Sequence, residues 1–229
     1  MKKIFRTFIA IAAVTLLFSG CNDDDPEGLA VKYIFAETPA GGGTAEFTIY
    51  PGVNLPWEII AGEDVEGFEE IDWIELSATE GKGKTVITAT MRPNTYNWPR
   101  SGKIIVTSGF WSIPVNIEQA GAPLVFSVTP AAIALNQSTG VPDITGTVTS
   151  NSSWYAEIVD KSDAGWDLRF DNNYTWLYGD GNGSIGLMSP ANHTIYPRTA
   201  RIKVTVYDAI DGENISRYID VTQQGAIPV

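Results

Sequence analysis

Acidic residues and a single histidine are the side chains of this sequence that could take part in hydrolytic chemistry. The densest acidic stretch is Glu63–Glu75, whereas a glycosidase needs two carboxylates about 5–10 Å apart across a cleft. The spacing within this stretch identifies no such pair and is typical of an acidic surface loop. A serine nucleophile would need His193 as its base, but no Gly-x-Ser-x-Gly turn occurs. The sequence therefore predicts a protein that is not an enzyme and has no catalytic residue.

Metal-binding chemistry has equally little support. One Cys and one His exclude a cysteine-rich zinc site, an iron–sulfur cluster and a multi-histidine site. Asp180-Gly181-Asn182-Gly183 offers oxygen ligands two residues apart, but Ala191 stands where a calcium loop has its bidentate Glu. A hairpin turn with glycine at positive φ explains this motif better. We expect no metal ion and no cofactor.

Aromatic residues in loops are better suited to contact a ligand. Trp98 lies in the segment Asn94–Arg100, which its Pro and Asn content marks as a loop. Flat aromatic faces pack on the C–H faces of sugar rings, and polar neighbours then bind the hydroxyl groups. Tyr96, Asn97, Trp98 and Arg100 are therefore candidate glycan-binding residues. The alternative is that these side chains cover the end of their own domain.

Two further aromatic residues have similar positions. Tyr196 precedes Pro197-Arg198 as Trp98 precedes Pro99-Arg100, and Trp111 follows the probable turn at Ser108-Gly109. We add Tyr196 and Trp111 to the candidate glycan-binding residues. Trp98, Trp111 and Trp166 also have no tryptophan counterpart in the repeat described next.

The chain contains an internal repeat of about 100 residues. Its landmarks are two Trp residues, a Gly-rich turn, an Asn, a Pro-Arg pair before a strand, and a closing strand that ends Gln-x-Gly. They start at Trp57 in the first copy and at Trp154 in the second, with the second Trp at Trp73 and Trp176. Recurrence of a Trp in both copies indicates a core anchor rather than a ligand contact.

The elements that must position these residues are short β-strands. Ile202, Val204 and Val206 alternate with polar residues, a period of two that marks a half-buried strand. Further expected strands cover Thr44–Tyr50, Lys84–Met91, Ile144–Ser150 and Trp154–Asp160. No stretch after residue 21 keeps a helical period for three turns. The expected fold is all-β, with two tandem immunoglobulin-like β-sandwich domains.

The N-terminus is typical of a secretory signal. Lys2, Lys3 and Arg6 precede the apolar run Thr7–Phe18, which at about 18 Å as a helix is too short to span a hydrocarbon core of about 30 Å. The sequence Phe18-Ser19-Gly20-Cys21 resembles the lipobox of bacterial lipoproteins, with Phe18 where Leu is commoner. This resemblance implies lipidation of Cys21, which becomes the new N-terminus.

The residues after Cys21 are acidic. Asn22-Asp23-Asp24-Asp25 is a solvated tether that also resembles the acidic signal of Bacteroidetes outer-surface lipoproteins. The formal net charge of −12 disfavours nucleic acid, which needs a positive binding surface. The expected organisation is a signal peptide over 1–20, a lipidated Cys and tether over 21–29, and sandwiches over 30–121 and 122–229.

The repeat itself resembles the BACON domain, whose name stands for Bacteroidetes-associated, carbohydrate-binding, often N-terminal. The resemblance covers about Val31–Gly121 and about Leu124–Ala226. The second copy departs from it by a longer middle, Asp160–Thr175, and by Ala200 in place of the Gly after the Arg. The resemblance implies an immunoglobulin-like fold, surface attachment and association with glycan use.

Two functions remain open at this point. The first is a non-catalytic surface lipoprotein, anchored by lipid in the outer membrane and facing the exterior, that binds polysaccharide or mucin glycan. The second is a structural spacer or protein-interaction module in a cell-surface glycan-handling complex, whose partners would be other surface lipoproteins. Exposure or burial of Trp98 and its neighbours is the property that separates the two.

Overall fold

The fold is described from a computed structural model of residues 28–33, 38–61, 71–138 and 146–227. Within these ranges the regular structure is all β, as predicted, and none of the described residues lies in a helix long and apolar enough to cross a membrane. The signal peptide, Cys21, the tether over 22–25 and most of the acidic stretch Glu63–Glu75 lie outside the described residues. The immunoglobulin-like assignment stays a prediction.

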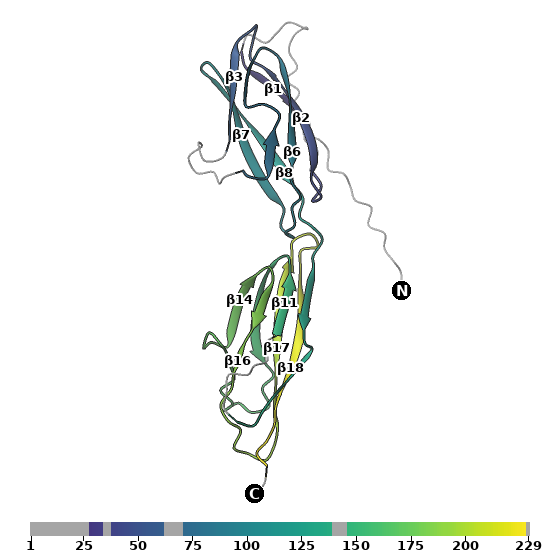
Figure 1. Cartoon of the computed structure of the whole chain (residues 1–229), viewed down its shortest axis with the longest axis vertical. Coiled ribbons are helices and arrows are strands. Elements are labelled where there is room, and N and C mark those ends of the chain that lie inside the picture. Colours follow the sequence, from purple (N-terminus) through teal and green to yellow (C-terminus); the bar gives the residue numbers. More distant parts are fainter. Residues whose placement is uncertain (1–27, 34–37, 62–70, 139–145, 228–229) are drawn as a thin grey trace, which may run out of the picture. The chain divides into compact units, whose positions relative to one another are not determined.

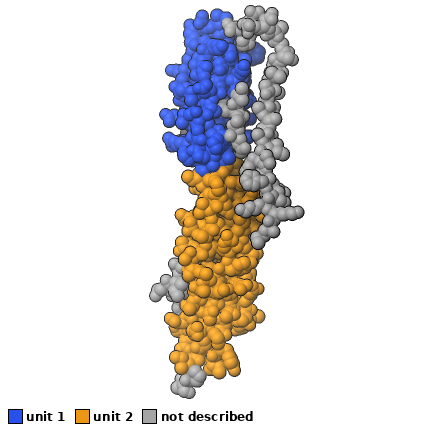
Figure 2. All heavy atoms as spheres, turned by 90° about the vertical axis from the view of Figure 1, so that its right-hand side faces the viewer, with its two compact units in different colours: residues 1–94, 100–120 blue, residues 95–99, 121–229 orange. Residues whose placement is uncertain are grey.

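The chain divides into two compact units (Figure 2). The first unit comprises residues 1–94 and 100–120, and the second comprises 95–99 and 121–229. The short segment Thr95–Pro99 thus belongs with the second unit, although the residues on both sides of it belong to the first.

The first unit contains two four-stranded sheets (Figure 1). One sheet has the order β1-β2-β6-β4, and its strands are β1 (Ala30–Tyr33), β2 (Gly43–Tyr50), β6 (Thr85–Met91) and β4 (Ile74–Leu76). The other has the order β5-β3-β7-β8, and its strands are β5 (Glu80–Lys82), β3 (Pro56–Ala61), β7 (Arg100–Ser108) and β8 (Trp111–Gln119). All pairings within the two sheets are antiparallel.

Alternation of apolar side chains explains why these sheets pack face to face. Phe47 and Ile49 of one sheet and Ile104 and Val106 of the other are buried in one cluster, while the residues between them are more exposed. Burial of this kind stabilises by about 25 cal/mol per Å² of apolar surface. Trp57 and Trp73 lie in the same cluster, so the prediction that they are core anchors is confirmed.

The second unit contains sheets of five, three and two strands. The five-stranded sheet has the order β10-β18-β17-β12-β14, with β10 (Ala132–Leu135), β18 (Glu213–Gln223), β17 (Arg198–Asp208), β12 (Ser153–Val159) and β14 (Trp176–Asp180). The three-stranded sheet has the order β15-β11-β9, with β15 (Gly183–Ile185), β11 (Gly146–Ser150) and β9 (Phe126–Thr129). The two-stranded sheet pairs β13 (Arg169–Phe170) with β16 (Leu187–Met188). Strands β10 and β18 pair in parallel, and the other pairs are antiparallel.

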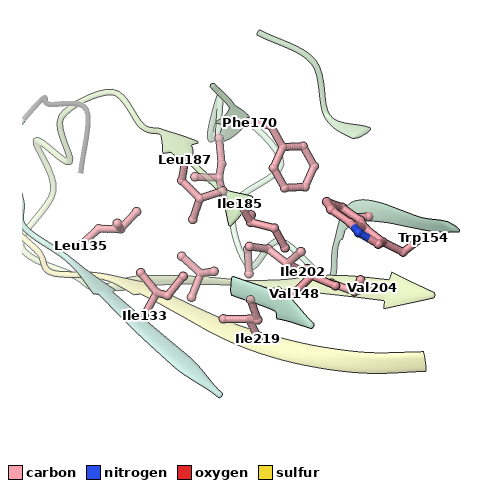
Figure 3. Close-up of a cluster of buried hydrophobic side chains, with 14 of the residues drawn as sticks. Ile133, Leu135, Val148, Trp154, Phe170, Ile185, Leu187, Ile202, Val204 and Ile219 are labelled. Atoms are coloured by element: carbon pink, nitrogen blue, oxygen red, sulfur yellow. The ribbon is translucent and has the colours of Figure 1, made fainter. Parts of the chain in front are cut away.

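The core of the second unit follows the same rule (Figure 3). Ile202 and Ile219 of the five-stranded sheet share one buried cluster with Ile185 and Leu187 of the smaller sheets. Trp154 belongs to this cluster, as predicted from its recurrence. Its ring lies over the backbone, where a Cβ on Gly179 would be only 2.1 Å from Trp154 Cζ2. Glycine is therefore the residue that lets this ring pack on the sheet.

The second repeated Trp was predicted incorrectly. Trp176, expected to be a core anchor, lies on the edge strand β14 and is 40% exposed. The core position is taken by Trp166, which is 0% exposed and lies in the longer middle segment of this unit. The Arg198 guanidinium lies 4.7 Å from the Trp166 ring, as Arg100 lies 4.4 Å from the Trp73 ring. Trp166 is thus the structural counterpart of Trp73.

Candidate functional site

Four aromatic side chains gather at one edge of the five-stranded sheet and form what we call the β14 strip. Its members are Tyr174, just before β14, Trp176 and Tyr178 on β14, and Tyr155 on the neighbouring strand β12. The register places Tyr155 opposite Tyr178 and Glu157 opposite Trp176. Directly opposed side chains in an antiparallel pair share one face of the sheet. The strip is therefore built from two adjacent strands on one face.

Strand geometry explains why these side chains point away from the core. Tyr174, Trp176 and Tyr178 stand at alternate positions, so they lie on the same side of the chain. The residues between them point inward: Leu177 packs against the core cluster, and Gly179 lies beneath Trp154. Because the inward positions carry the packing, the outward positions are free to hold large aromatic residues.

The rings of the strip form a continuous chain of contacts. Ring centroids are 4.9 Å apart between Tyr174 and Trp176, which are stacked, and 5.4 Å apart between Trp176 and Tyr178, which meet edge to face. Tyr155 lies 4.9 Å from Tyr178. Exposed fractions are 56% for Tyr174, 40% for Trp176 and 68% for Tyr178. Such contacts hold the rings in place at about 0.5–1.5 kcal/mol per pair, and each of these three rings keeps a large solvent-facing surface.

Polar groups beside the strip are paired with each other. Lys203 Nζ lies 3.2 Å from Glu157 Oε1, and the hydroxyl groups of Thr205 and Ser216 are 2.9 Å apart. Burial raises the pKa of Tyr155, and the nearby Glu157 adds to this. The Tyr155 hydroxyl is therefore protonated at neutral pH and able to donate a hydrogen bond. The face thus combines aromatic surface with hydrogen-bonding groups, and the charges of Lys203 and Glu157 are paired with each other.

This arrangement suits a sugar ligand. From Tyr174 to Tyr178 the strip extends about 13 Å, at about 3.3 Å per residue. Exposed ring faces can stack on the apolar faces of successive sugar rings, and the flanking groups can bind hydroxyl groups.

The sequence-predicted residues of the loop 95–99 have different surroundings from one another. Asn97 is 0% exposed, and its side-chain amide donates to Ala122 O at 3.1 Å and Asp208 Oδ1 at 3.2 Å. Its side-chain oxygen accepts a hydrogen bond from Ala209 N at 2.6 Å. Asn97 therefore holds the loop in place and has no surface for a glycan. Tyr96 and Trp98 are exposed, but the Trp98 ring is already stacked on Tyr207 at 5.4 Å.

Arg100 also serves the fold. Its Nε donates to Gln119 Oε1 at 2.8 Å, and its Nη2 donates to Arg92 O at 2.8 Å, while its guanidinium covers Trp73. Burial lowers the pKa of Arg100. Arg198 repeats the arrangement, donating from Nε to Gln223 Oε1 at 2.8 Å. The repeated Arg and Gln thus form one buried polar cluster in each unit.

The remaining predicted residues lie at the surface. Tyr196 is exposed, and its carbonyl accepts a hydrogen bond from the buried Asn192 amide at 2.8 Å. Trp111 is exposed at the start of β8 in the first unit. The structure thus places Tyr96, Trp98 and Tyr196 in loops of the second unit and does not bring any of them into the β14 strip.

The motif at 180–183 is a turn with glycine at positive φ, as predicted, but it is not a hairpin, because β14 and β15 belong to different sheets. Gly181 has a φ of 64°, and the Asn182 side chain accepts a hydrogen bond from Ser150 N at 3.1 Å. The Asp180 carboxylate accepts one from the Ser153 hydroxyl at 2.9 Å. Among the described residues, no group of three or more His, Cys, Asp and Glu side chains could hold a metal ion.

The sequence analysis missed the β14 strip, although a signal for it was present. Tyr174, Trp176 and Tyr178 alternate with smaller residues, the pattern of a strand with one aromatic face. Trp176 was predicted to be the repeat counterpart of Trp73 and was therefore assigned to the core, so the alternating aromatic residues were not recognised as an exposed face.

Residues 57–120 match the family model described as "BACON: Putative binding domain, N-terminal". No curated protein matches the chain.

Several solved structures are similar to parts of the chain. A Bacteroides ovatus GH5 xyloglucanase in complex with a XXXG heptasaccharide is 24% identical over 51% of this chain and 23% of its own, with a TM-score of 0.33. A Porphyromonas gingivalis W83 protein of unknown function is 9% identical over 86% of this chain and 99% of its own, with a TM-score of 0.31. The titin fragment A168169 is 6% identical over 85% of this chain and 98% of its own, with a TM-score of 0.48.

Proposed function

We propose that this protein is a non-catalytic surface lipoprotein that binds glycan through exposed aromatic residues, and that the β14 strip is its binding surface. The observation that carries the proposal is the row of exposed rings of Tyr174, Trp176 and Tyr178, in which each ring contacts the next. Polysaccharide and mucin glycan are the ligand classes that fit such a surface, because both offer repeated sugar faces.

Several properties of the strip favour carbohydrate over other ligands. The strand backbone fixes the spacing of the rings, so little side-chain freedom is lost on binding. Two charged pairs lie beside the strip, Glu157 with Lys203 and Arg201 with Asp220, while the Asp180 carboxylate at the end of β14 accepts a hydrogen bond from the Ser153 hydroxyl. A neutral, hydroxyl-rich polymer can donate hydrogen bonds to such a carboxylate, whereas the chain's net charge of −12 disfavours anionic polymers.

Membrane attachment forms the second part of the proposal. Lipidation of Cys21 would hold the chain at the outer membrane, with its folded units towards the exterior. The supporting observation is the lipobox-like sequence at 18–21, which contains the chain's single Cys. The acyl chains would supply the membrane affinity, and the two units would present the glycan surface.

A spacer or protein-interaction role is the alternative, and the buried polar clusters favour it. Arg100 with Gln119 and Arg198 with Gln223 stabilise each unit from within. The features shared by the two copies thus maintain the fold, as expected of repeated scaffold units. The β14 strip has no equivalent among these shared features.

Native affinity gels containing individual plant polysaccharides or host mucin would test the proposal. The protein is compared with Trp176→Ala and with the matched controls Trp98→Ala and Trp111→Ala, each checked for folding by near-UV circular dichroism. Retardation by one polymer that is lost only in Trp176→Ala supports the β14 strip. Loss in Trp98→Ala alone moves the site to the loop 95–99. Free migration through every polymer supports the spacer role.

A further inference from the structure

The first unit carries a cluster of exposed apolar side chains at one end, which we call the apolar tip. It consists of Val53 and Leu55 before β3, Phe110 in the turn between β7 and β8, and Trp111 at the start of β8. Their exposed fractions are 71%, 50%, 107% and 60%. A Phe side chain that is entirely exposed beside an exposed Trp is costly in water, because large apolar side chains stabilise a protein when they are buried.

Hydrogen bonds bring the turns of this end together. Ser108 Oγ donates to Pro56 O at 2.7 Å, which joins the end of β7 to the segment at the start of β3. Gly83 N donates to Leu55 O at 3.0 Å, which joins the β5–β6 turn to the same segment. The apolar tip is thus one surface built from three neighbouring turns rather than a set of scattered residues.

The charge of the tip is unlike that of the whole chain. The three turns, over residues 51–56, 82–84 and 108–111, contain Lys82 and Lys84 but no Asp or Glu, in a chain with a net charge of −12. Both lysines are exposed, and Lys84 Nζ lies 4.9 Å from the Tyr50 ring centroid. Apolar residues with Trp and flanking lysines are the composition of surfaces that enter the membrane interface.

The chain reaches the first unit at this same end. A Cβ on Gly28 would lie 3.3 Å from Trp111 Cε2, so the segment that leads from Cys21 arrives beside the tip. Cys21 and Gly28 are seven positions apart, and a fully extended chain of that length spans about 25 Å at most. A lipid on Cys21 would therefore keep the apolar tip within about 25 Å of the bilayer.

We propose that the apolar tip inserts into the interface of the bilayer that holds the lipid on Cys21. This inference depends on the lipidation proposed above and is independent of glycan binding by the β14 strip. Phe110 and Val53 enter the apolar region, Trp111 lies at the interface, and Lys82 and Lys84 meet the lipid headgroups. The anchor and the tip together fix how the first unit faces the membrane.

The test uses the full lipidated protein reconstituted in phosphatidylcholine vesicles. Lipidation occupies the sulfur of Cys21, so Phe110→Cys introduces a single reactive thiol for an environment-sensitive dye. Gly41→Cys is the matched control, because Gly41 is exposed and a Cβ there has no atom within 4 Å. Gly41 lies two residues before the start of β2, at the end of that strand away from the apolar tip. Quenching of each dye by nitroxide-labelled lipid is then measured.

We expect the emission at position 110 to shift to the blue and to be quenched by lipid, while the emission at position 41 stays unchanged. No quenching at 110, or equal quenching at both positions, would overturn the insertion. A mass spectrum without acyl chains on Cys21 would overturn it as well. Affinity gels on Phe110→Cys keep the two proposals separate, because glycan retardation is expected to match that of the unsubstituted protein whatever the membrane result.

Discussion

Truncation of two tryptophans in the second unit tests the assignment of core and surface. Trp166→Ala removes a side chain that is 0% exposed, donates from Nε1 to Ser189 Oγ at 2.9 Å and lies beneath Arg198. A buried Trp covers about 150–250 Å², and Trp→Ala in a core costs about 3–5 kcal/mol. The lost hydrogen bond adds about 1 kcal/mol, so we expect a loss of about 4–6 kcal/mol in the free energy of unfolding.

Trp176→Ala is the matched substitution on the same unit. Its ring touches Tyr174 and Tyr178 at the surface, and two such contacts give an expected loss of about 1–3 kcal/mol. Urea unfolding followed by tryptophan fluorescence and by far-UV circular dichroism measures both values. A cost for Trp176→Ala equal to that for Trp166→Ala, or a cost below about 1 kcal/mol for Trp166→Ala, would refute the assignment.

Three further predictions follow from the second unit. Gln223→Ala leaves two main-chain carbonyls and the Nε of Arg198 without their buried partner. We expect the free energy of unfolding, measured in urea, to fall by about 3 kcal/mol. A decrease under about 1 kcal/mol would count against the buried polar cluster. Gly179→Ala places a Cβ against the Trp154 ring and should destabilise by about 1–3 kcal/mol, with a changed near-UV dichroism spectrum; an unchanged spectrum and stability would contradict this packing. Tyr155 should ionise above the ordinary tyrosine pKa of about 10, because burial disfavours its phenolate, so its absorbance change appears late in an alkaline titration and is absent in Tyr155→Phe. The stability linked to Tyr155 then falls as the pH rises. An absorbance change at lower pH that is lost in Tyr155→Phe would contradict the raised pKa.

Period-two patterns in the sequence were sufficient to predict much of the fold. The stretches Thr44–Tyr50, Lys84–Met91 and Trp154–Asp160 correspond to β2, β6 and β12, within one residue at each end. These strands were recognisable because one face of each is buried and the other is not. That difference is encoded residue by residue and needs no knowledge of distant partners.

The second core Trp could not be assigned from spacing. Arg100 follows Trp73 by 27 residues, whereas Arg198 follows Trp166 by 32 and Trp176 by 22. The two candidates thus depart equally from the first copy, in opposite directions. Only the packing of Trp166 under Arg198 decides between them, and that contact depends on how the longer middle segment folds back over the core.

The candidate site in the structure lies at other residues than those proposed from the sequence. The residue types of the loop at 94–100 predicted a glycan-binding role for Asn97, whereas its structural role became visible only through its buried bonds to Asp208 and Ala209. These partners lie 111 and 112 positions away along the chain. No local pattern in the sequence carries information about such a distant partner.

The most direct test of glycan binding at the β14 strip is an NMR titration with ¹⁵N-tryptophan-labelled protein. The chain has 7 Trp residues, each with one indole N–H signal, and single substitutions assign them. On addition of an oligosaccharide from the polymer that retards the protein in gels, the Trp176 signal should shift progressively while those of Trp98 and Trp111 stay in place. A shift at Trp98 or Trp111 with Trp176 unchanged would contradict the account.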